Sequence, residues 1–193
     1  MLYLNQRDYP HIPYPNNADN GYQPAENQNV AKTGCGICSA CMIVEHLTTQ
    51  TLSLEDCIVL SVSNNANNRP GTSMRVLGPV VAEKFDLEYT EASDKEELLA
   101  HLAKGGEAIV NVAEKPDGTP GLFTRAGHYM VLISADGEQI CFFDPNYTAE
   151  AYGKGELKEK VDSSKAPFLS CSLDLLWQET EARKIRFYLF KRK

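Results

Sequence analysis

The feature that most constrains this chain is a cysteine between two glycines that leads directly into an apolar segment with helical periodicity. The stretch reads Thr33-Gly34-Cys35-Gly36-Ile37-Cys38-Ser39-Ala40-Cys41-Met42-Ile43-Val44. Its positions Ile37, Cys41 and Val44 fall at i, i+4 and i+7, the spacing of one helix face. The pattern predicts a helix over residues 36–47, with the Cys35 thiol at its N-terminus.

A thiol at a helix N-terminus has altered chemistry. The first-turn amides are unpaired and carry the positive end of the helix dipole, so they stabilise a thiolate relative to a thiol. We therefore expect the pKa of Cys35 to lie below the ordinary cysteine value of about 8.5, and the thiolate is the nucleophilic form. The flanking glycines are expected to let the backbone turn sharply and a substrate carbonyl approach closely. From this stretch alone, a buried small residue in a tight turn is the alternative.

Length and charge limit the class of protein. A chain of 193 residues with 42% hydrophobic and 23% charged content predicts a single globular domain over residues 1–193. The net charge is −7 and the one basic cluster is the terminal 191–193, so we expect no nucleic-acid partner. No apolar run reaches the roughly eighteen residues of a membrane span. Without a signal-peptide pattern we expect a cytoplasmic location, and removal of a leader before Met1 stays an open alternative.

Six cysteines in a chain of this length do not form a disulfide scaffold, so reduced thiols are expected. The rival interpretation of Cys35, Cys38 and Cys41 is a metal site, since C-x-x-C-x-x-C matches part of the bacterial ferredoxin run. That run is incomplete here, and a zinc site would need further ligands such as Cys57 or His46. On one continuous helix the three thiols spread over a wide arc. We therefore predict no metal and no cofactor.

Periodicity and turn residues divide the rest of the chain. We expect a loop-like arm over residues 1–32 with a short strand at 2–6, helices at 53–63, 73–84, 93–104 and 172–182, strands at 108–112 and 184–190, and a charged loop region at 146–165. The chain is thus expected to be helical up to about residue 106 and a sheet from there. The polar tract near 64–69 and the loop near 116–124 are placed to line a cleft, and for the polar tract a solvated loop is the favoured alternative.

Two apolar runs around a glycine-containing loop predict a β-hairpin. They are residues 129–133 and 139–143, around Ala135-Asp136-Gly137. A three-residue loop pairs Ser134 with Glu138 and puts His128 opposite Asp144, with Cβ atoms about 4.5–5.5 Å apart. A two-residue Asp-Gly turn would instead put His128 opposite Pro145. We prefer the first register, which predicts an imidazole–carboxylate pair.

Together these residues satisfy what nucleophilic catalysis by cysteine requires, which is a base for the thiol and a third group that orients the base. Cys35, His128 and Asp144 all lie at element termini, where side chains converge on one edge of a sheet. Taken singly, His128 is a structural histidine and Asp144 a turn former; the joint pattern favours catalysis. The other histidines have simpler explanations: His11 lies in the arm, and His46 and His101 lie in last helical turns, where a charge–dipole role suffices.

These motifs resemble the bacteriocin-processing-peptidase-like, or double-glycine-peptidase-like, branch of the papain-like cysteine peptidases. The resemblance covers residues 2–150 and rests on Leu4-Asn5-Gln6, Gly34-Cys35-Gly36, Gly127-His128-Tyr129 and Phe143-Asp144-Pro145. It implies an α+β papain-like fold, with a helical part that carries the thiol packed on an antiparallel sheet that carries the base. By matching positions, Cys35 would be the nucleophile, His128 the general base and acid, Asp144 the orienting group and Gln6 an oxyanion donor beside the Cys35 amide. The sequence departs from the family at Ile37-Cys38, where many members carry proline and a small polar residue, and this affects the substrate pocket.

The expected function is a cysteine hydrolase, a peptidase or amidase that acts on a peptide or small amide substrate through a thioester. Three alternatives stay open. The same site could transfer the acyl group to an amine or thiol, as in phytochelatin-synthase-like relatives; the fold could be a non-catalytic peptide-binding module; or the thiols could hold zinc or an iron–sulfur cluster.

Overall fold

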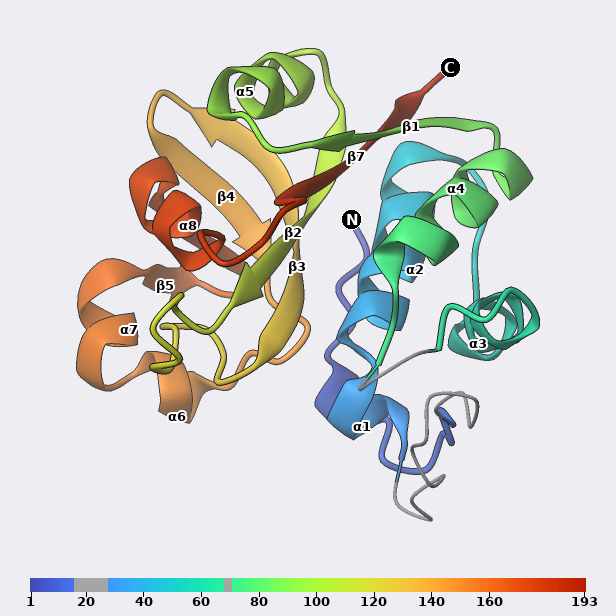
Figure 1. Cartoon of the computed structure of the whole chain (residues 1–193), viewed down its shortest axis with the longest axis horizontal. Helices are drawn as coiled ribbons and strands as arrows, with labels where there is room; N and C mark the ends of the chain where they lie inside the picture. The colour runs from blue at the N-terminus through green and yellow to red at the C-terminus, as the bar shows by residue number, and fades with distance from the viewer. Residues whose placement is uncertain (16–27, 68–70) are drawn as a thin grey trace.

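A computed structural model describes residues 1–15, 28–67 and 71–193, and it has the predicted α+β architecture (Figure 1). Its centre is a seven-stranded antiparallel sheet in the order β1-β7-β2-β3-β4-β6-β5. The strands are β1 (Leu87–Ala92), β2 (Glu107–Ala113), β3 (Gly127–Asp136), β4 (Gln139–Phe143), β5 (Asp162–Lys165), β6 (Phe168–Ser172) and β7 (Phe187–Arg192). The helices are η1 (Gln6–Asp8), α1 (Val30–Thr33), α2 (Cys35–Leu47), α3 (Leu54–Ser63), α4 (Met74–Lys84), α5 (Lys95–Ala103), α6 (Ala149–Tyr152), α7 (Gly155–Lys160) and α8 (Leu173–Glu179).

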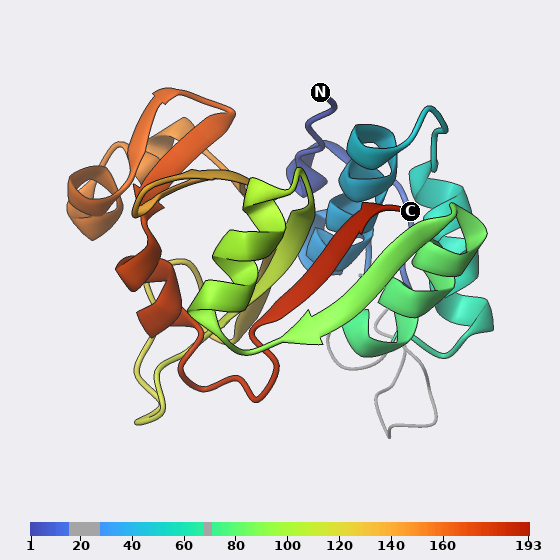
Figure 2. The same ribbon diagram turned by 90° about the horizontal axis from the view of Figure 1, so that it is seen from above.

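The sheet separates two apolar cores. Helices α2, α3 and α4 lie on one side of it, and α5 and α8 lie on the other (Figures 1 and 2). Side chains alternate between the faces of a strand, so Ile109 and Val131 join the core under α2 whereas Val110 and Leu132 join the core under α5. The helical part that carries Cys35 is therefore packed directly on β2 and β3, as the resemblance implied.

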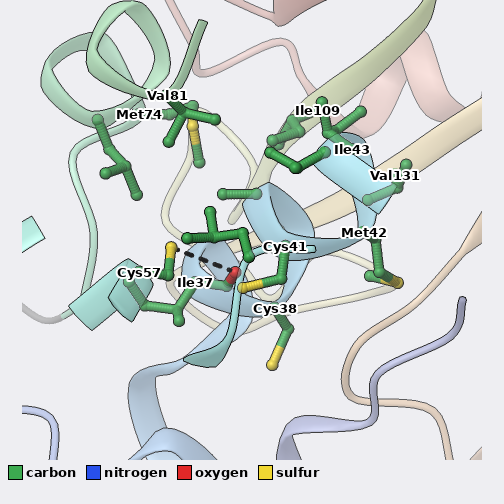
Figure 3. Close-up of a cluster of buried hydrophobic side chains, with 14 of the residues drawn as sticks. Ile37, Cys38, Cys41, Met42, Ile43, Cys57, Met74, Val81, Ile109 and Val131 are labelled. Atoms are coloured by element: carbon green, nitrogen blue, oxygen red, sulfur yellow. Dashed lines mark hydrogen bonds between the residues drawn. The ribbon is translucent and has the colours of Figure 1, made fainter. Parts of the chain in front are cut away.

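Helix α2 lies at the centre of the first core. Its residues 36–44 are all buried, so the helix is apolar nearly all round rather than along the single predicted face. Figure 3 shows its side chains meeting those of α4, β2 and β3 on several sides. Burial on all sides fixes the helix rigidly, and with it the position of its first residue.

The two glycines beside Cys35 serve close packing and not the sharp turn that we expected. Gly34 has φ −87°, an ordinary value for any residue. A Cβ at Gly34 would lie 2.5 Å from the Val30 carbonyl oxygen, and one at Gly36 would lie 2.6 Å from Cβ of Thr72. Larger residues would thus push α2 away from the segments that surround its N-terminus.

Most predicted helices and strands are confirmed, but several strands and the start of one helix differ from the prediction. Strand β1 interrupts the half of the chain expected to be helical, and β6 was not expected. The predicted loop region 146–165 contains two short helices and β5, and residues 2–6 form no strand. Helix α5 begins at Lys95, two residues later than predicted, because Asp94 caps it by accepting a hydrogen bond from the Glu97 amide. The polar tract near 64–69 lies partly outside the described residues.

The β3–β4 hairpin has a two-residue turn, which is one residue shorter than the preferred loop and lies one residue later than the alternative Asp-Gly turn. Gly137 and Glu138 form a two-residue turn, and Asp136 pairs with Gln139. Gly137 has φ 59°, which suits the first central position of a type II′ turn. Gly137 is a turn residue as predicted, but the preferred loop over 135–137 begins two residues too early.

A bulge then changes the register again between Leu132 and Ser134, and beyond it Val131 pairs with Phe143. One further step of this ladder places Asp144 two residues along β3 from His128, so the prediction that they are directly opposed is wrong. Side chains repeat their direction every two residues, so a displacement of two keeps both groups on the same face as diagonal neighbours. The predicted pair therefore forms despite the wrong register.

None of the helices within residues 1–15, 28–67 and 71–193 has the length and apolar character needed to cross a bilayer.

His46 lies in the last turn of α2, as predicted, and it also forms a buried hydrogen-bonded pair that the sequence did not indicate. Its Nδ1 lies 2.8 Å from Oε2 of Glu107, and both side chains are almost completely buried. Its Nε2 donates to the Leu2 carbonyl oxygen at 2.6 Å, since that oxygen can only accept. His46 thus ties the N-terminal arm, which carries Gln6, to α2 and β2. His101 similarly contacts the Phe190 carbonyl oxygen at 2.8 Å.

Replacing His46 by alanine is expected to lower the free energy of unfolding by about 3 kcal/mol, because it leaves a buried carboxylate and a carbonyl without a partner. The measurement is urea denaturation followed by circular dichroism. The exposed His11 is the matched control, and His11→Ala should change the free energy by less than about 0.5 kcal/mol. Equal stabilities of the two variants would contradict a stabilising role for the pair.

Candidate active site

The Cys35 thiol lies at the first residue of α2 and is partly exposed. No side chain caps this helix end, so its first-turn amides are available to the sulfur. The backbone amides of Gly36 and Tyr129 and the His128 ring all hydrogen-bond to it. The predicted thiol at a helix start is confirmed, and the sheet brings two further donors to it.

His128 and Asp144 form a buried hydrogen-bonded pair at the edge of the sheet. His128 is the second residue of β3, and Asp144 directly follows β4. Nε2 of His128 lies 2.6 Å from Oδ1 of Asp144. Their exposed fractions are 7% and 4%. Because Asp144 occupies Nε2, Nδ1 is the ring nitrogen left for the interaction with Cys35. The sulfur, the imidazole and the carboxylate therefore form one continuous chain.

The three groups shift one another's pKa values in the direction of a charged pair. Burial raises the pKa of Cys35, but the hydrogen bond and charge of His128 outweigh it and the net pKa is lowered. Burial likewise disfavours a charged His128, yet Asp144 and Cys35 together raise its pKa to about 10. The lowered pKa of Cys35 and the raised pKa of His128 both favour a thiolate beside an imidazolium.

Asp144 stays ionised because other groups also hydrogen-bond to it. Burial raises its pKa, but the charge and hydrogen bond of His128 lower it, helped by the Tyr152 hydroxyl and the Asn146 amide, and the net pKa is lowered. Tyr152 donates to Oδ2 at 2.6 Å, and the Asn146 amide donates to Oδ1 at 2.7 Å. The Tyr3 hydroxyl donates to the backbone carbonyl of Asp144 at 2.8 Å. These contacts fix the carboxylate on every side.

Sequence reasoning missed Tyr152 and Tyr3 as supports of Asp144. Tyr152 ends a four-residue helix inside the stretch that was taken for a charged loop. Its ring is nearly completely buried in the second apolar core although the surrounding sequence is polar. The spacing of eight residues from Asp144 is too long for a local rule to link the two. Tyr3 lies in the N-terminal arm, which shows no period.

Gln6 lies between the two halves of the site and is 5% exposed. Its backbone amide donates to the Pro145 carbonyl at 2.7 Å, and its Nε2 donates to the Ala31 carbonyl at 2.9 Å. One Nε2 hydrogen is therefore used, and the second is free for another acceptor. Gln28 is a second glutamine upstream of Cys35. Within the described residues no side-chain hydrogen bond connects it to Cys35, and its Oε1 is buried without a partner.

The other cysteines of the rival metal interpretation lie in the apolar core between α2 and the sheet. Cys38, Cys41 and Cys57 are fully buried, and the Cys57 thiol donates to the Ile37 carbonyl at 3.8 Å (Figure 3). Burial raises the pKa of Cys38 and of Cys41. In the described part of the chain no three histidine, cysteine or acidic side chains are grouped so that they could hold a metal ion.

A pocket of about 260 Å³ opens beside the thiol. Residues from both halves of the fold line it: Cys35, Thr72, Asn111, Ala126, Gly127, His128, Tyr129 and Arg183. The predicted cleft segment 116–124 does not line it, and neither do the described residues 64–67 of the other one. Thr72, Ala126 and Gly127, which do line it, lie just beyond these segments. Larger hollows near α7 and α8 touch none of the three site residues.

Comparison with known proteins identifies the family. The model of the Peptidase_C39 like family matches residues 21–165, a region that contains Cys35, His128 and Asp144 but not Gln6 or Arg183. A search of curated protein sequences gives no match.

Two solved structures show the same fold at low sequence identity. The peptidase domain of Streptococcus ComA, a bifunctional ABC transporter involved in a quorum-sensing pathway, matches with a TM-score of 0.53 and 16% identity, over 84% of this chain and 93% of that one. A Bacillus anthracis protein described as a C39-like peptidase matches with a TM-score of 0.56 and 14% identity, over 83% and 88%. On the family match, which covers most of the sequence, the chain belongs to the Peptidase_C39 like family.

Proposed function

We propose that this protein is a cysteine hydrolase that cleaves a peptide or related amide bond through Cys35, His128 and Asp144. The observation that carries the proposal is one continuous chain of contacts, in which His128 hydrogen-bonds to the Cys35 sulfur and, at 2.6 Å, to the buried carboxylate of Asp144. A buried imidazole between a thiol and a carboxylate is the arrangement that activates a nucleophile. Membership of a peptidase family supports this class of reaction.

The reaction would begin with the Cys35 thiolate attacking the carbonyl carbon of the substrate. Its electron pair forms the S–C bond, and the carbonyl oxygen takes the negative charge. Collapse of this intermediate breaks the C–N bond, and His128 gives its Nδ1 proton to the departing amine. The thioester then reacts with water, from which His128 takes a proton, and the acid and the thiolate are released.

Asp144 would act on the ring and not on the substrate. Its contact at Nε2 holds the imidazole with Nδ1 toward the sulfur and stabilises the imidazolium before proton transfer. The hydrogen bonds of Tyr152 and the Asn146 amide keep the carboxylate in this position. Asp144, Tyr152 and Asn146 are therefore positioning residues in this proposal.

The oxyanion would be bound by the Cys35 backbone amide and by Nε2 of Gln6. The amide is at the first position of α2, where a helix leaves its N–H groups unpaired. Gln6 has a free Nε2 hydrogen and is fixed by bonds to Ala31 and Pro145. A donor fixed before the reaction stabilises developing charge most effectively because it need not reorganise.

The identity of the nucleophile is tested by thiol labelling at pH 7. Iodoacetamide should modify Cys35 first, because its thiolate is present at this pH while burial raises the pKa of Cys38, Cys41, Cys141 and Cys171. Cys35→Ala should abolish both this labelling and all hydrolysis of a peptide library, as measured by mass spectrometry.

Cys141 is the matched control because it is also partly exposed. Cys141→Ala should leave labelling and hydrolysis unchanged. Hydrolysis that survives in Cys35→Ala would refute the proposed nucleophile, and fast labelling that disappears in Cys141→Ala would assign the reactive thiol elsewhere.

Gln6→Ala should lower kcat by about a hundredfold with little change in KM, because an oxyanion donor acts in the transition state. The rate of Cys35 alkylation should stay the same, since alkylation forms no oxyanion. Gln28→Ala provides the control for loss of an upstream glutamine. An unchanged kcat in Gln6→Ala, or an equal loss in Gln28→Ala, would contradict the assignment.

A further inference from the structure

Arg183 gives the pocket beside the thiol an unbalanced positive charge. Apart from the Cys35–His128 pair, whose opposite charges balance each other, it is the one charged side chain among the described lining residues, and no carboxylate lines the pocket. The whole protein has a net charge of −7. A cation at this position in an acidic protein is therefore a local feature of the pocket and does not follow from the general composition.

The guanidinium is held in place by the backbone around His128. Arg183 belongs to the segment between α8 and β7, and its Nη2 donates to the carbonyl oxygens of Ala126 at 3.1 Å and Val112 at 3.4 Å. Gly127 makes this position possible, because a Cβ there would lie 2.4 Å from Nη2. Because Gly127 has no side chain, the Arg183 guanidinium can lie directly beside the backbone that carries His128.

Arg183 lacks an acidic partner. In residues 1–15, 28–67 and 71–193 no carboxylate forms an ion pair with it, whereas Arg75 is paired with Glu91. Its Nε is buried and has no acceptor. A buried N–H without an acceptor is uncommon in folded proteins. The group that a guanidinium binds most strongly is a carboxylate, through two parallel charge-assisted hydrogen bonds.

The rest of the pocket suits a small polar group. Its volume of about 260 Å³ is below the roughly 300–1,000 Å³ of sites for drug-sized ligands, so it has room for about one side chain. Thr72 and Asn111 add neutral polar groups. Cys35 lines the same pocket, so a group bound there belongs to a substrate residue close to the bond that is cleaved.

We propose that Arg183 selects substrates that carry a carboxylate next to the cleaved bond, either an acidic side chain or the C-terminal carboxylate of a short peptide. The inference rests on the proposed function, because it assigns the substrate class of the same site. Arg183 would bind the substrate and take no part in bond cleavage.

The test compares reagents that differ only in this charge. Peptidyl chloromethyl ketones with glutamate or glutamine at either of the two residues before the ketone test an acidic side chain. Short peptide substrates with a free or amidated C-terminus test a terminal carboxylate. The charged member of at least one pair should react with Cys35 or be hydrolysed at least about tenfold faster in the wild type, as expected for a charge-assisted hydrogen bond.

Variants separate recognition from a purely structural role. Arg183→Gln should abolish the preference, Arg183→Glu should reverse it, and Arg183→Lys should restore part of it. Arg125→Gln removes an equal charge from the exposed loop nearby and should keep the preference. A structural role would lower the rates of both members of a pair equally. No preference in the wild type, or a preference that survives in Arg183→Gln, would overturn the inference.

A binding measurement distinguishes failure of the carboxylate-recognition proposal from failure of the hydrolase proposal. Calorimetry measures binding of uncleavable glutamate and glutamine peptides, and of free and amidated ones, to Cys35→Ala and to Cys35→Ala/Arg183→Gln. If no reagent modifies Cys35 but the carboxylate peptide still binds only when Arg183 is present, the hydrolase proposal fails and carboxylate recognition stands. Equal binding of all peptides to both proteins would end the inference by itself.

Discussion

The hydrogen bond between His128 Nε2 and Asp144 Oδ1, 2.6 Å long and buried, is the interaction on which the candidate site depends. Burial alone would remove the charge of an imidazole. The carboxylate reverses this effect and raises the pKa of His128 to about 10, and the charged ring in turn lowers the pKa of Cys35. A buried carboxylate needs its own partners, and Tyr152 and the Asn146 amide supply them. Each group in the site thus depends on the next one: Tyr152 holds Asp144, Asp144 keeps His128 charged, and His128 lowers the pKa of Cys35.

Packing brings Cys35 together with the sheet edge that carries His128 and Asp144. Helix α2 is buried on all sides and lies against β2 and β3, so its first residue has a fixed position relative to the edge of the sheet. Three glycines keep the segments close: Gly34 and Gly36 beside the thiol, and Gly127 beside the Arg183 guanidinium. The N-terminal arm is tied to the same region by His46 and by the bonds of Gln6. Local close contacts, more than backbone flexibility, explain the glycines of the sequence motifs.

The parts of this site that local rules govern could be predicted from the sequence. Helical periodicity and the position of Cys35 gave the helix start correctly, and the two-residue alternation of strands gave the shared face of His128 and Asp144. The register could not be predicted, because the bulge between Leu132 and Ser134 has no distinctive residue and the turn tolerates more than one length. Tyr152 and Arg183 were missed for a different reason: each meets the site through tertiary packing from a segment without periodicity. The family match extends the prediction to the fold but covers neither Gln6 nor Arg183.

The central claim is that Cys35 and His128 exist as a thiolate–imidazolium pair, and ultraviolet absorbance of the thiolate tests it most directly. The difference in absorbance between the wild type and Cys35→Ser is followed as pH rises. Because the pKa of Cys35 is lowered and that of His128 is raised, the thiolate signal should be present well below the ordinary cysteine pKa of about 8.5. In His128→Ala it should appear only near or above that value. A wild-type signal that appears only near the ordinary pKa, or a midpoint that His128→Ala leaves unchanged, would contradict the account.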